Sequence, residues 1–452
     1  RRGAPAPEPS ERRAPVCSDC HTSHAISRGD TPEFLSDIVG ECGSCHADLY
    51  RTYRESYHGQ VQRLGSERAA RCSDCHGAHH ILPPEDPRST LSPTNAPDTC
   101  ARCHTELKNM SAAGRANFVR YSPHADYRDR RRDPILFYVW LYFIVLMSVT
   151  FTFWGLHSIA WFARGTINRL RHGPHPRPAR HSPAIQRFST WHRVTHGLVI
   201  ISFMGLTITG LPLKFSDRPW AAWLMRLLGG TDFAGYLHRT FAILVLVYLV
   251  MHVIHLWRNR RGDGASVLTR VFGPHSMLPM KRDWQEFVAM VRWFFGRGAK
   301  PTFDRWTYWE KFDYWADLVG TFIIGLSGLL LWFPTFFAEY FSGYWFNVAT
   351  VVHGYEALLA VAFIFTIHFF NAHLRWEKFP VDDVIFTGQL PEEEFAEERA
   401  PQYERLKAAG TLDALRVEPA PSWQRVLAKI VAYISLTVGF SLVILIIWAG
   451  LQ

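Results

Sequence analysis

The sequence predicts a mainly α-helical membrane protein, in which a bundle of six transmembrane helices follows a loop-rich N-terminal domain. Six apolar stretches between residues 134 and 451 are long enough to cross a bilayer, whose hydrocarbon core takes about 20 residues of helix. Basic loops separate several of these stretches. Residues 1–133, by contrast, are polar and Arg-rich, and they contain all eight cysteines of the 452-residue chain.

The eight cysteines form four CxxCH units, the attachment signature of c-type haem. Zinc knuckles and redox CxxC pairs are the alternatives, but neither requires a histidine directly after every second cysteine. We therefore expect four covalent haems c, each with a proximal histidine, in a domain outside the cytoplasm, where haem c is attached. The expected residues are Cys17, Cys20 and His21; Cys42, Cys45 and His46; Cys72, Cys75 and His76; and Cys100, Cys103 and His104.

An internal repeat predicts the distal iron ligands. CSDCHTSHAI at Cys17 returns as CSDCHGAHHI at Cys72, and the second CxxCH unit of each half also matches, so two dihaem modules are expected. Each module has one extra histidine three residues after its first proximal histidine, and another downstream of its second haem site. The former lies too close to its neighbour to reach the other side of the same iron, so it is expected to bind a neighbouring haem. The four extra histidines are His24, His58, His79 and His124, with His80 as a competitor of His79.

The distribution of basic residues predicts how the spans are oriented. Connections after the first and third spans are rich in Lys and Arg, whereas those after the second and fourth have few. The positive-inside rule therefore puts the N-terminal domain on the periplasmic side of a bacterial inner membrane, and these loops account for the net charge of +9 without nucleic acid. The expected spans are about 134–163, 191–213, 233–257, 314–337, 351–370 and 426–448.

Three domains follow from this pattern. We expect a periplasmic tetrahaem domain over residues 1–133, five spans over 134–379, and an acidic cytoplasmic linker with the sixth span over 380–452. The acidic part, 380–421, is most simply a solvated linker, and the basic amphipathic segment 281–298 is a candidate for the membrane surface. The chain begins with Arg rather than Met, so we expect an export signal that precedes it.

The fifth span carries two histidines, His353 and His368. Fifteen residues return to within about 60° of the same helix face, and at about 1.5 Å per residue the two rings lie about 22 Å apart. Ionisable side chains in a membrane usually face the bundle interior and have a function. Two haems b stacked between helices fit this pattern; a pair of buried histidines bonded to backbone carbonyls is the alternative.

Histidines in other spans lie at the same membrane depths as His353 and His368, so they are candidates for the second ligand of each haem b. His238 lies near the periplasmic end with His353. Near the cytoplasmic end, His196 and His252 both accompany His368. By spacing alone His252 is attractive, because it stands fourteen residues after His238, on the same helix face.

Four motifs carry a family resemblance: RVTHGLVIISFMGLTITGLPL, YLHRTFAILVLVYLVMH, EKFDYWADLVGTFIIGLSGLLLWFPTFFAEYF and VVHGYEALLAVAFIFTIH. Over roughly residues 187–376 the chain resembles the membrane cytochrome b of the formate dehydrogenase gamma-subunit family. The resemblance implies two haems b, one bound by His196 and His368 on the cytoplasmic side and one by His238 and His353 on the periplasmic side. His252 is then a polar neighbour.

The resemblance also implies a quinone site beside the cytoplasmic-side haem, where the family uses an Asn just before its third span. The matching position here is Asp313, whose carboxyl offers a proton route. An interfacial Asp paired with Lys311 or Arg305 is the alternative. As a whole, the chain is similar to fused multihaem c/dihaem b proteins that join the quinone pool to periplasmic cytochromes. We expect a quinone-reactive subunit that uses menaquinone or ubiquinone, or else a non-catalytic anchor that relays electrons within a redox complex.

Overall fold

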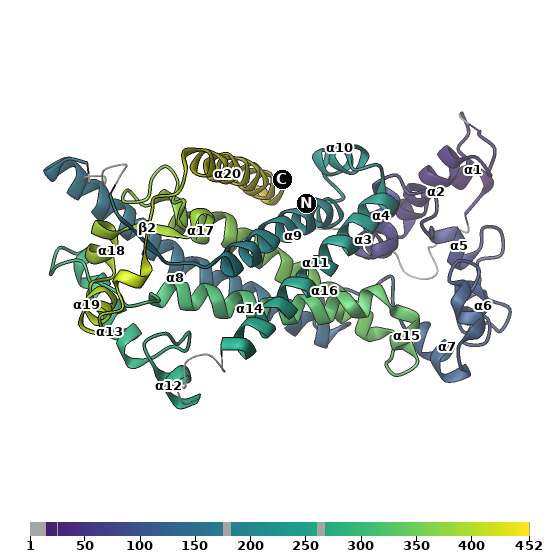
Figure 1. Ribbon diagram of the computed structural model, residues 1–452. Coiled ribbons are helices and arrows are strands. Elements are labelled where there is room, and N and C mark those ends of the chain that lie inside the picture. The colour runs from purple at the N-terminus through teal and green to yellow at the C-terminus, as the bar shows by residue number, and fades with distance from the viewer. Residues whose placement is uncertain (1–14, 25, 175–181, 260–266, 452) are drawn as a thin grey trace. The chain divides into compact units, whose positions relative to one another are not determined.

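The computed structural model is mainly helical and describes residues 15–24, 26–174, 182–259 and 267–451 (Figure 1). Six helices among these residues are long and apolar enough to cross a membrane, which confirms the predicted fold class. They are α8 (Pro134–His172), α9 (Thr190–Lys214), α11 (Thr231–Asn259), α14 (Tyr308–Trp332), α16 (Tyr344–Phe363), which continues as the π-helical turns η3 (Ile364–His368) and η4 (Phe370–Leu374), and α20 (Ser422–Leu451).

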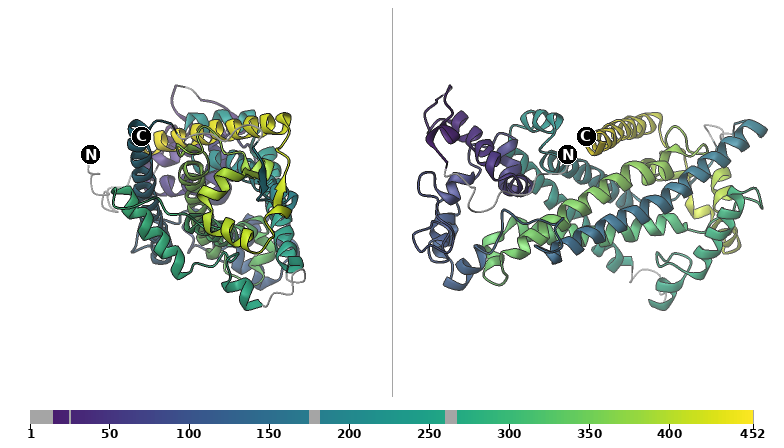
Figure 2. Two further views of the ribbon diagram at one scale, coloured as in Figure 1. Left: turned by 60° about the vertical axis from the view of Figure 1, so that its left-hand side comes forward. Right: turned by 180° about the vertical axis from the view of Figure 1, so that it is seen from behind.

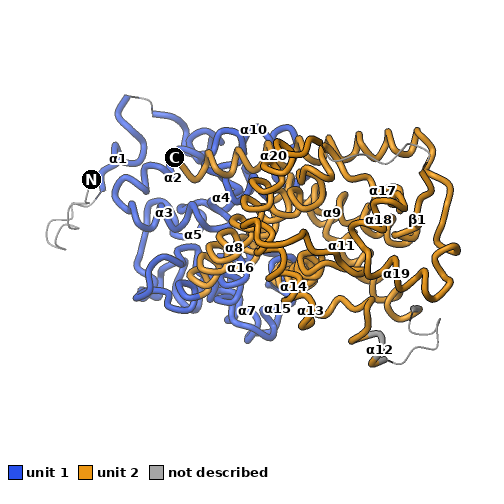
Figure 3. The backbone as a smooth tube through the Cα atoms, turned by 90° about the vertical axis from the view of Figure 1, so that its left-hand side faces the viewer, with its two compact units in different colours: residues 1–138, 211–234, 330–350 blue, residues 139–210, 235–329, 351–452 orange. Residues whose placement is uncertain are grey.

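The chain divides into two compact units (Figure 3). The first contains the N-terminal domain and the connections that follow the second and fourth spans. The second contains most of the bundle and the remaining connections. Unit 1 comprises Arg1–Tyr138, Leu211–Ala234 and Leu330–Thr350, and unit 2 comprises Val139–Gly210, Gly235–Leu329 and Val351–Gln452.

Unit 1 is built from short helices joined by loops. Two small apolar clusters hold it together, one around Leu107 and Phe118 and one around Leu64 and Met225. Few apolar residues are available in this part of the sequence, so neither cluster is large. The helices are α1 (Cys17–His21), α2 (Pro32–Cys45), α3 (Ala47–Glu55), α4 (Tyr57–Arg63), α5 (Cys72–His76), α6 (Ala96–Cys100), η2 (Thr105–Asn109), α7 (Ala112–Phe118), α10 (Pro219–Leu227) and α15 (Pro334–Ala338).

In unit 2 the first span lies alongside the fifth (Figure 2). The rings of Phe143 on α8 and Tyr355 on α16 stack with their centroids 6.4 Å apart. Further along α8, Trp154 and Trp161 enter an aromatic cluster with Trp309 of α14. Offset and edge-on aromatic contacts of this kind add to the stabilisation that comes from buried area alone.

The amphipathic segment forms α13 (Lys281–Phe294), and part of its apolar face packs on protein, while Trp284 is exposed. Met290 is fully buried, and Trp293 is buried beside Trp161. The physical reason is that Trp and Phe side chains of α8 and α14 offer a complementary apolar surface. A short helix, α12 (Val267–Phe272), precedes it.

The acidic segment is packed rather than solvated, contrary to the expectation from its composition. A three-stranded antiparallel sheet with the order β2-β1-β3 joins it to the connection between the first two spans. Ile185, Leu390 and Phe395 form its core, each at most 2% exposed. The elements are β1 (Ala184–Gln186), α17 (Val384–Thr387), β2 (Gln389–Pro391), α18 (Glu392–Glu398), α19 (Ala400–Ala408), η5 (Asp413–Leu415) and β3 (Arg416–Val417).

The acidic side chains of this segment have basic partners. Lys378 is buried and forms ion pairs with Asp382 at 3.5 Å, with Glu398 at 3.1 Å and with Glu394. Burial opposes a charge on Lys378, but the surrounding carboxylates raise the pKa of its ammonium group. The many carboxylates therefore stabilise a folded module.

Helix α14 is offset from the predicted fourth span at both ends. It begins at Tyr308 because Thr307 and Glu310 form a capping box: Glu310 N donates to Thr307 Oγ1 over 3.2 Å, and Thr307 N donates to Glu310 Oε2 over 2.8 Å. It ends at Trp332 because Pro334 follows, and the residue before a proline is disfavoured in helical geometry.

Candidate haem and quinone sites

Three pairs of histidines in unit 1 lie at the spacing of two imidazoles on one iron. An imidazole nitrogen lies about 2 Å from the metal that it binds, so two ring centroids on opposite sides of one metal are about 6 Å apart. Each observed pair combines the histidine of one CxxCH unit with one of the extra histidines. The centroid distances are 6.4 Å for His21 and His79, 6.4 Å for His76 and His124, and 6.2 Å for His104 and His58.

Two of the paired rings, His58 and His124, show features of metal ligands. Burial, followed by the neighbouring His104, lowers the pKa of His58 to about 4, so the ring is neutral, the form that binds a metal. His124 uses its Nδ1 atom against the Leu49 carbonyl at 3.0 Å, which leaves Nε2 for the iron. These residues fit the expected haems c.

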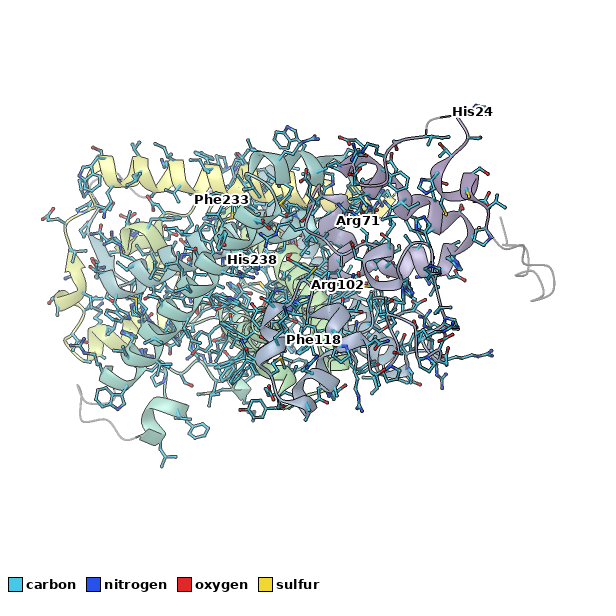
Figure 4. The ribbon with its side chains drawn as sticks, turned by 90° about the vertical axis from the view of Figure 1, so that its right-hand side faces the viewer. His24, Arg71, Arg102, Phe118, Phe233 and His238 are labelled. Carbon is cyan, nitrogen blue, oxygen red and sulfur yellow. The ribbon has the colours of Figure 1, made fainter. Side chains whose placement is uncertain are left out.

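The fourth haem site, at Cys42, lacks such a pair. His46 lies within electrostatic range of His76, but that ring already pairs with His124. The three pairs use His58, His79 and His124, so His24 is the extra histidine that is left for the haem at Cys42. His24 is exposed at the edge of unit 1, well apart from Phe118 (Figure 4). His80 is also exposed. The distal ligand of this site therefore stays a prediction.

Inside unit 2, His238 of α11 and His353 of α16 form a fourth pair, with centroids 6.3 Å apart. The Nδ1 atom of His238 lies 2.9 Å from Thr209 Oγ1, and that of His353 lies 3.1 Å from the Ile324 carbonyl. A hydrogen bond at one ring nitrogen fixes the tautomer and presents the other nitrogen to a metal. The arrangement fits a haem b held through the two Nε2 atoms.

Two glycines make room for these rings. A Cβ atom at Gly210 of α9 would lie 3.2 Å from His238 Cε1, and one at Gly328 of α14 would lie 3.1 Å from His353 Cε1. The residue before each glycine contacts the same ring, and Ser327 Oγ lies 3.3 Å from His353 Nδ1. Sequence reasoning missed these residues, although TGLPL and SGLLL repeat one hydroxyl-glycine-leucine pattern in the two spans.

Near the other end of the fifth span, His368 contacts Asp313. The His368 Nδ1 atom lies 3.1 Å from Asp313 Oδ2, and His196 of α9 lies within electrostatic range of the same ring. His368 lies in η3, so the angle predicted for a continuous α-helix does not apply to it. Single π-helical turns are frequent at functional sites.

The alternative partners of Asp313 are engaged elsewhere. The Lys311 ammonium group pairs with Asp283 at 2.8 Å, and Arg305 donates to the Arg187 carbonyl over 2.7 Å. Asp313 Oδ1 is buried without a hydrogen-bond partner. One carboxylate oxygen thus holds His368, and the other is available to a further group.

Comparisons with known proteins match the two parts of the chain to different families. The family described as "Cytochrome c7 and related cytochrome c" matches residues 28–105, which include three of the four CxxCH units. The cytochrome b556(fdo) subunit of formate dehydrogenase from Escherichia coli (strain K12) is 21% identical over 188 residues, 42% of this chain and 78% of the relative. The cytochrome b556(Fdn) subunit of nitrate-inducible formate dehydrogenase, from the same strain and from Shigella flexneri, is 22% identical over 205 residues, 45% of this chain and 83% of the relative.

The chain joins a cytochrome c7-type domain to a region homologous to cytochrome b556 subunits of formate dehydrogenase. This combination supports haem c in the cytochrome c7-type domain, haem b in the cytochrome b region, and membrane electron transfer as the role of the protein. The matched relatives are named as subunits of formate dehydrogenase.

Proposed function

We propose that this chain transfers electrons between a menaquinone or ubiquinone pool in the bacterial inner membrane and periplasmic redox partners. Four haems c and two haems b, once bound, supply one-electron carriers, and the protein supplies ligands, spacing and electrostatics. The proposed iron ligands are the four CxxCH histidines with His24, His58, His79 and His124, and, in the bundle, His196 with His368 and His238 with His353.

The observation that carries the proposal is the pair of His238 and His353. Their centroid distance of 6.3 Å is that of two ligands of one metal, and hydrogen bonds orient both rings. A pair of structural histidines would instead be expected to use both nitrogens on protein groups. Because His368 belongs to the same span, a second redox site at another depth follows from the same helix.

The composition of unit 1 supports a periplasmic N-terminal domain. The connection after the fourth span contacts that domain: Glu339 Oε1 accepts from Ser111 N over 3.0 Å, and Asn347 exchanges hydrogen bonds of 2.8 and 3.0 Å with Ser122. The positive-inside rule assigns this connection to the periplasm independently. Haem c attachment favours the same side.

Asp313 is the proposed quinone and proton site. Quinone chemistry moves two protons with two electrons, so the site needs a proton-accepting group next to its electron carrier. Asp313 has one oxygen on His368 and a second oxygen without a hydrogen-bond partner. We propose that the second oxygen exchanges protons with the quinone at the start of α14.

Stopped-flow reduction of the purified haem-loaded protein by a quinol tests this function. The proposal expects both haems b, and then the haems c, to be reduced by quinol within the turnover time of the enzyme complex. Dithionite provides the control, because it reduces all haems without a quinone site. Absence of quinol-dependent reduction in the presence of the partner subunits would favour the anchor that only relays electrons.

A further inference from the structure

A cavity of about 270 Å³ lies in unit 2, among the three connections predicted to be cytoplasmic. Arg187 lines it from the first connection, His275 and Arg305 from the second, and Gln402 and Leu406 from the third. Ligand pockets commonly have about 300–1,000 Å³. The cavity therefore suits a small molecule or a single head group, rather than a quinone with its tail.

The Arg187 guanidinium group lines this cavity and uses only part of its hydrogen-bonding capacity. Its side chain is only 3% exposed. The Nη2 atom donates to Glu310 Oε1 over 3.1 Å and to the Arg305 carbonyl over 3.2 Å, whereas Nη1 is buried without a hydrogen-bond partner. Buried polar groups are normally hydrogen-bonded, so this donor is available to an acceptor bound in the cavity.

Positive charge exceeds negative charge around Arg187. Arg399 also binds Glu310, at 3.0 and 3.2 Å, so two guanidinium groups share one carboxylate, and Arg305 lies within electrostatic range of it. Burial, and next the repulsion from Arg399, lowers the pKa of Arg187 to about 9. Burial likewise lowers the pKa of Arg305 to about 10. An anion in the cavity would relieve this repulsion.

Two other carboxylates lie near this charge but are matched by cations of their own. Glu398 lies within electrostatic range of Arg187 and pairs with the buried Lys378 at 3.1 Å. Asp304 pairs with Arg282 at 2.9 Å and with Arg405 at 2.5 Å, so it is already matched by two guanidinium groups of its own. Arginine presents a planar set of donors that matches phosphate and carboxylate oxygens. The excess charge at Arg187 thus favours an oxyanion.

The Gln402 side chain indicates that the ligand also carries a hydrogen-bond donor. Gln402 is 4% exposed and lines the same cavity, and its Oε1 atom is buried without a hydrogen-bond donor. A protonated phosphate oxygen or a neighbouring hydroxyl would supply that donor. Phe395 and Leu406 provide an apolar flank.

We propose that this cavity binds a phosphate-bearing anion, which accepts hydrogen bonds from Arg187 and Arg305 and donates one to Gln402. Its source is either the head group of an anionic phospholipid or a soluble phosphate compound. Because each of the three connections contributes a lining residue, the bound anion ties them together. It also competes with Glu310, the third residue of the helix that carries Asp313, for the Arg187 guanidinium group.

Thermal unfolding of the purified haem-loaded chain tests the site, with circular dichroism as the readout and inorganic phosphate as the probe at constant ionic strength. The unfolding midpoint should rise with phosphate and saturate. Leu406→Trp, which fills the cavity, and Gln402→Leu should each weaken or abolish the rise. Arg187→Gln alone does not test the site, because this substitution also breaks the ion pair with Glu310 and so changes the unfolding midpoint without phosphate. Arg416→Gln is the matched control, since this half-exposed arginine pairs with Glu392 outside the cavity.

Native mass spectrometry of protein from phosphatidylglycerol or phosphatidylcholine nanodiscs distinguishes the sources. Retention of phosphatidylglycerol by the wild type but not by Leu406→Trp identifies a lipid head group. A phosphate-dependent midpoint shift lost in Leu406→Trp, with equal lipid retention in both proteins, identifies a soluble phosphate compound. The proposal is wrong if two results occur together. The first is that phosphate shifts the unfolding midpoint of the wild type and of Leu406→Trp equally, or shifts neither midpoint; the second is that both proteins retain the same lipid. Quinol reactivity plays no part in these readouts, so they are independent of the proposed function.

Discussion

The His252 Nε2 atom lies 2.9 Å from the hydroxyl oxygen of Tyr314. Nε2 is the nitrogen that His238 and His353 leave available, since their Nδ1 atoms are the ones engaged. His252 therefore has the hydrogen bonding of a polar neighbour, although its spacing from His238 suits a ligand. This contrast supports His196 as the partner of His368.

Substitution of the two competing histidines is expected to give opposite results. His196→Ala should remove one haem b and leave the other, because the iron loses an axial ligand. His252→Ala should keep both haems b, since it removes only a hydrogen bond to Tyr314. Pyridine haemochrome spectra of the purified variants measure how many haems b each protein retains. Loss of a haem in His252→Ala, with full content in His196→Ala, would reverse the assignment.

The total cofactor content is the second prediction. Four CxxCH units and two histidine pairs in the bundle imply four haems c and two haems b in this chain. The ratio in pyridine haemochrome spectra should therefore be four to two. A ratio of four to zero would contradict the proposed role of the histidines in the bundle, while leaving the N-terminal domain as proposed.

The third prediction uses two glycines of one helix. A Cβ atom at Gly328 would lie 3.1 Å from His353 Cε1, whereas one at Gly325 would meet nothing within 4 Å. Gly328→Ala should therefore displace the His353 ring and lower the content, or shift the potential, of one haem b. Gly325→Ala should change neither. Alanine favours a helix over glycine by about 1 kcal/mol, so helix propensity would not account for a loss in Gly328→Ala. Equal behaviour of the two variants in a redox titration would argue against this contact.

Local sequence patterns predicted the elements whose cause is local. The CxxCH units, the six apolar spans and the histidines of the fifth span could be recognised because one stretch of chain contains the whole signal. The start of α14 was also readable, since TYWE at Thr307 is a capping box. Hydropathy alone, which does not register a capping box, places the start of this span at 314.

Features that depend on distant partners were not predictable in this way. The composition of residues 380–421 alone predicts a solvated linker. The residues that bury this segment, Lys378 and Ile185, lie outside it in the sequence. The cavity beside Arg187 requires three connections to meet, which no single stretch encodes. Asp313 was identified by resemblance, but its contact with His368 spans 55 residues and came only from the structure.

The last prediction concerns Asp313, which combines a hydrogen bond to His368 with a second, unpartnered oxygen. Asp313→Ala should slow quinol-dependent haem reduction by about 10²–10⁴-fold, the typical cost of losing one proton-transfer group. Haem content and dithionite reduction should remain intact. Asp313→Asn separates two roles, because an amide can still bond to the His368 ring but does not accept a proton. If Asn restores quinol kinetics, Asp313 acts only by orienting His368; if Asn is as slow as Ala, the carboxylate itself is required. Unchanged kinetics in Asp313→Ala would remove this residue from the quinone site.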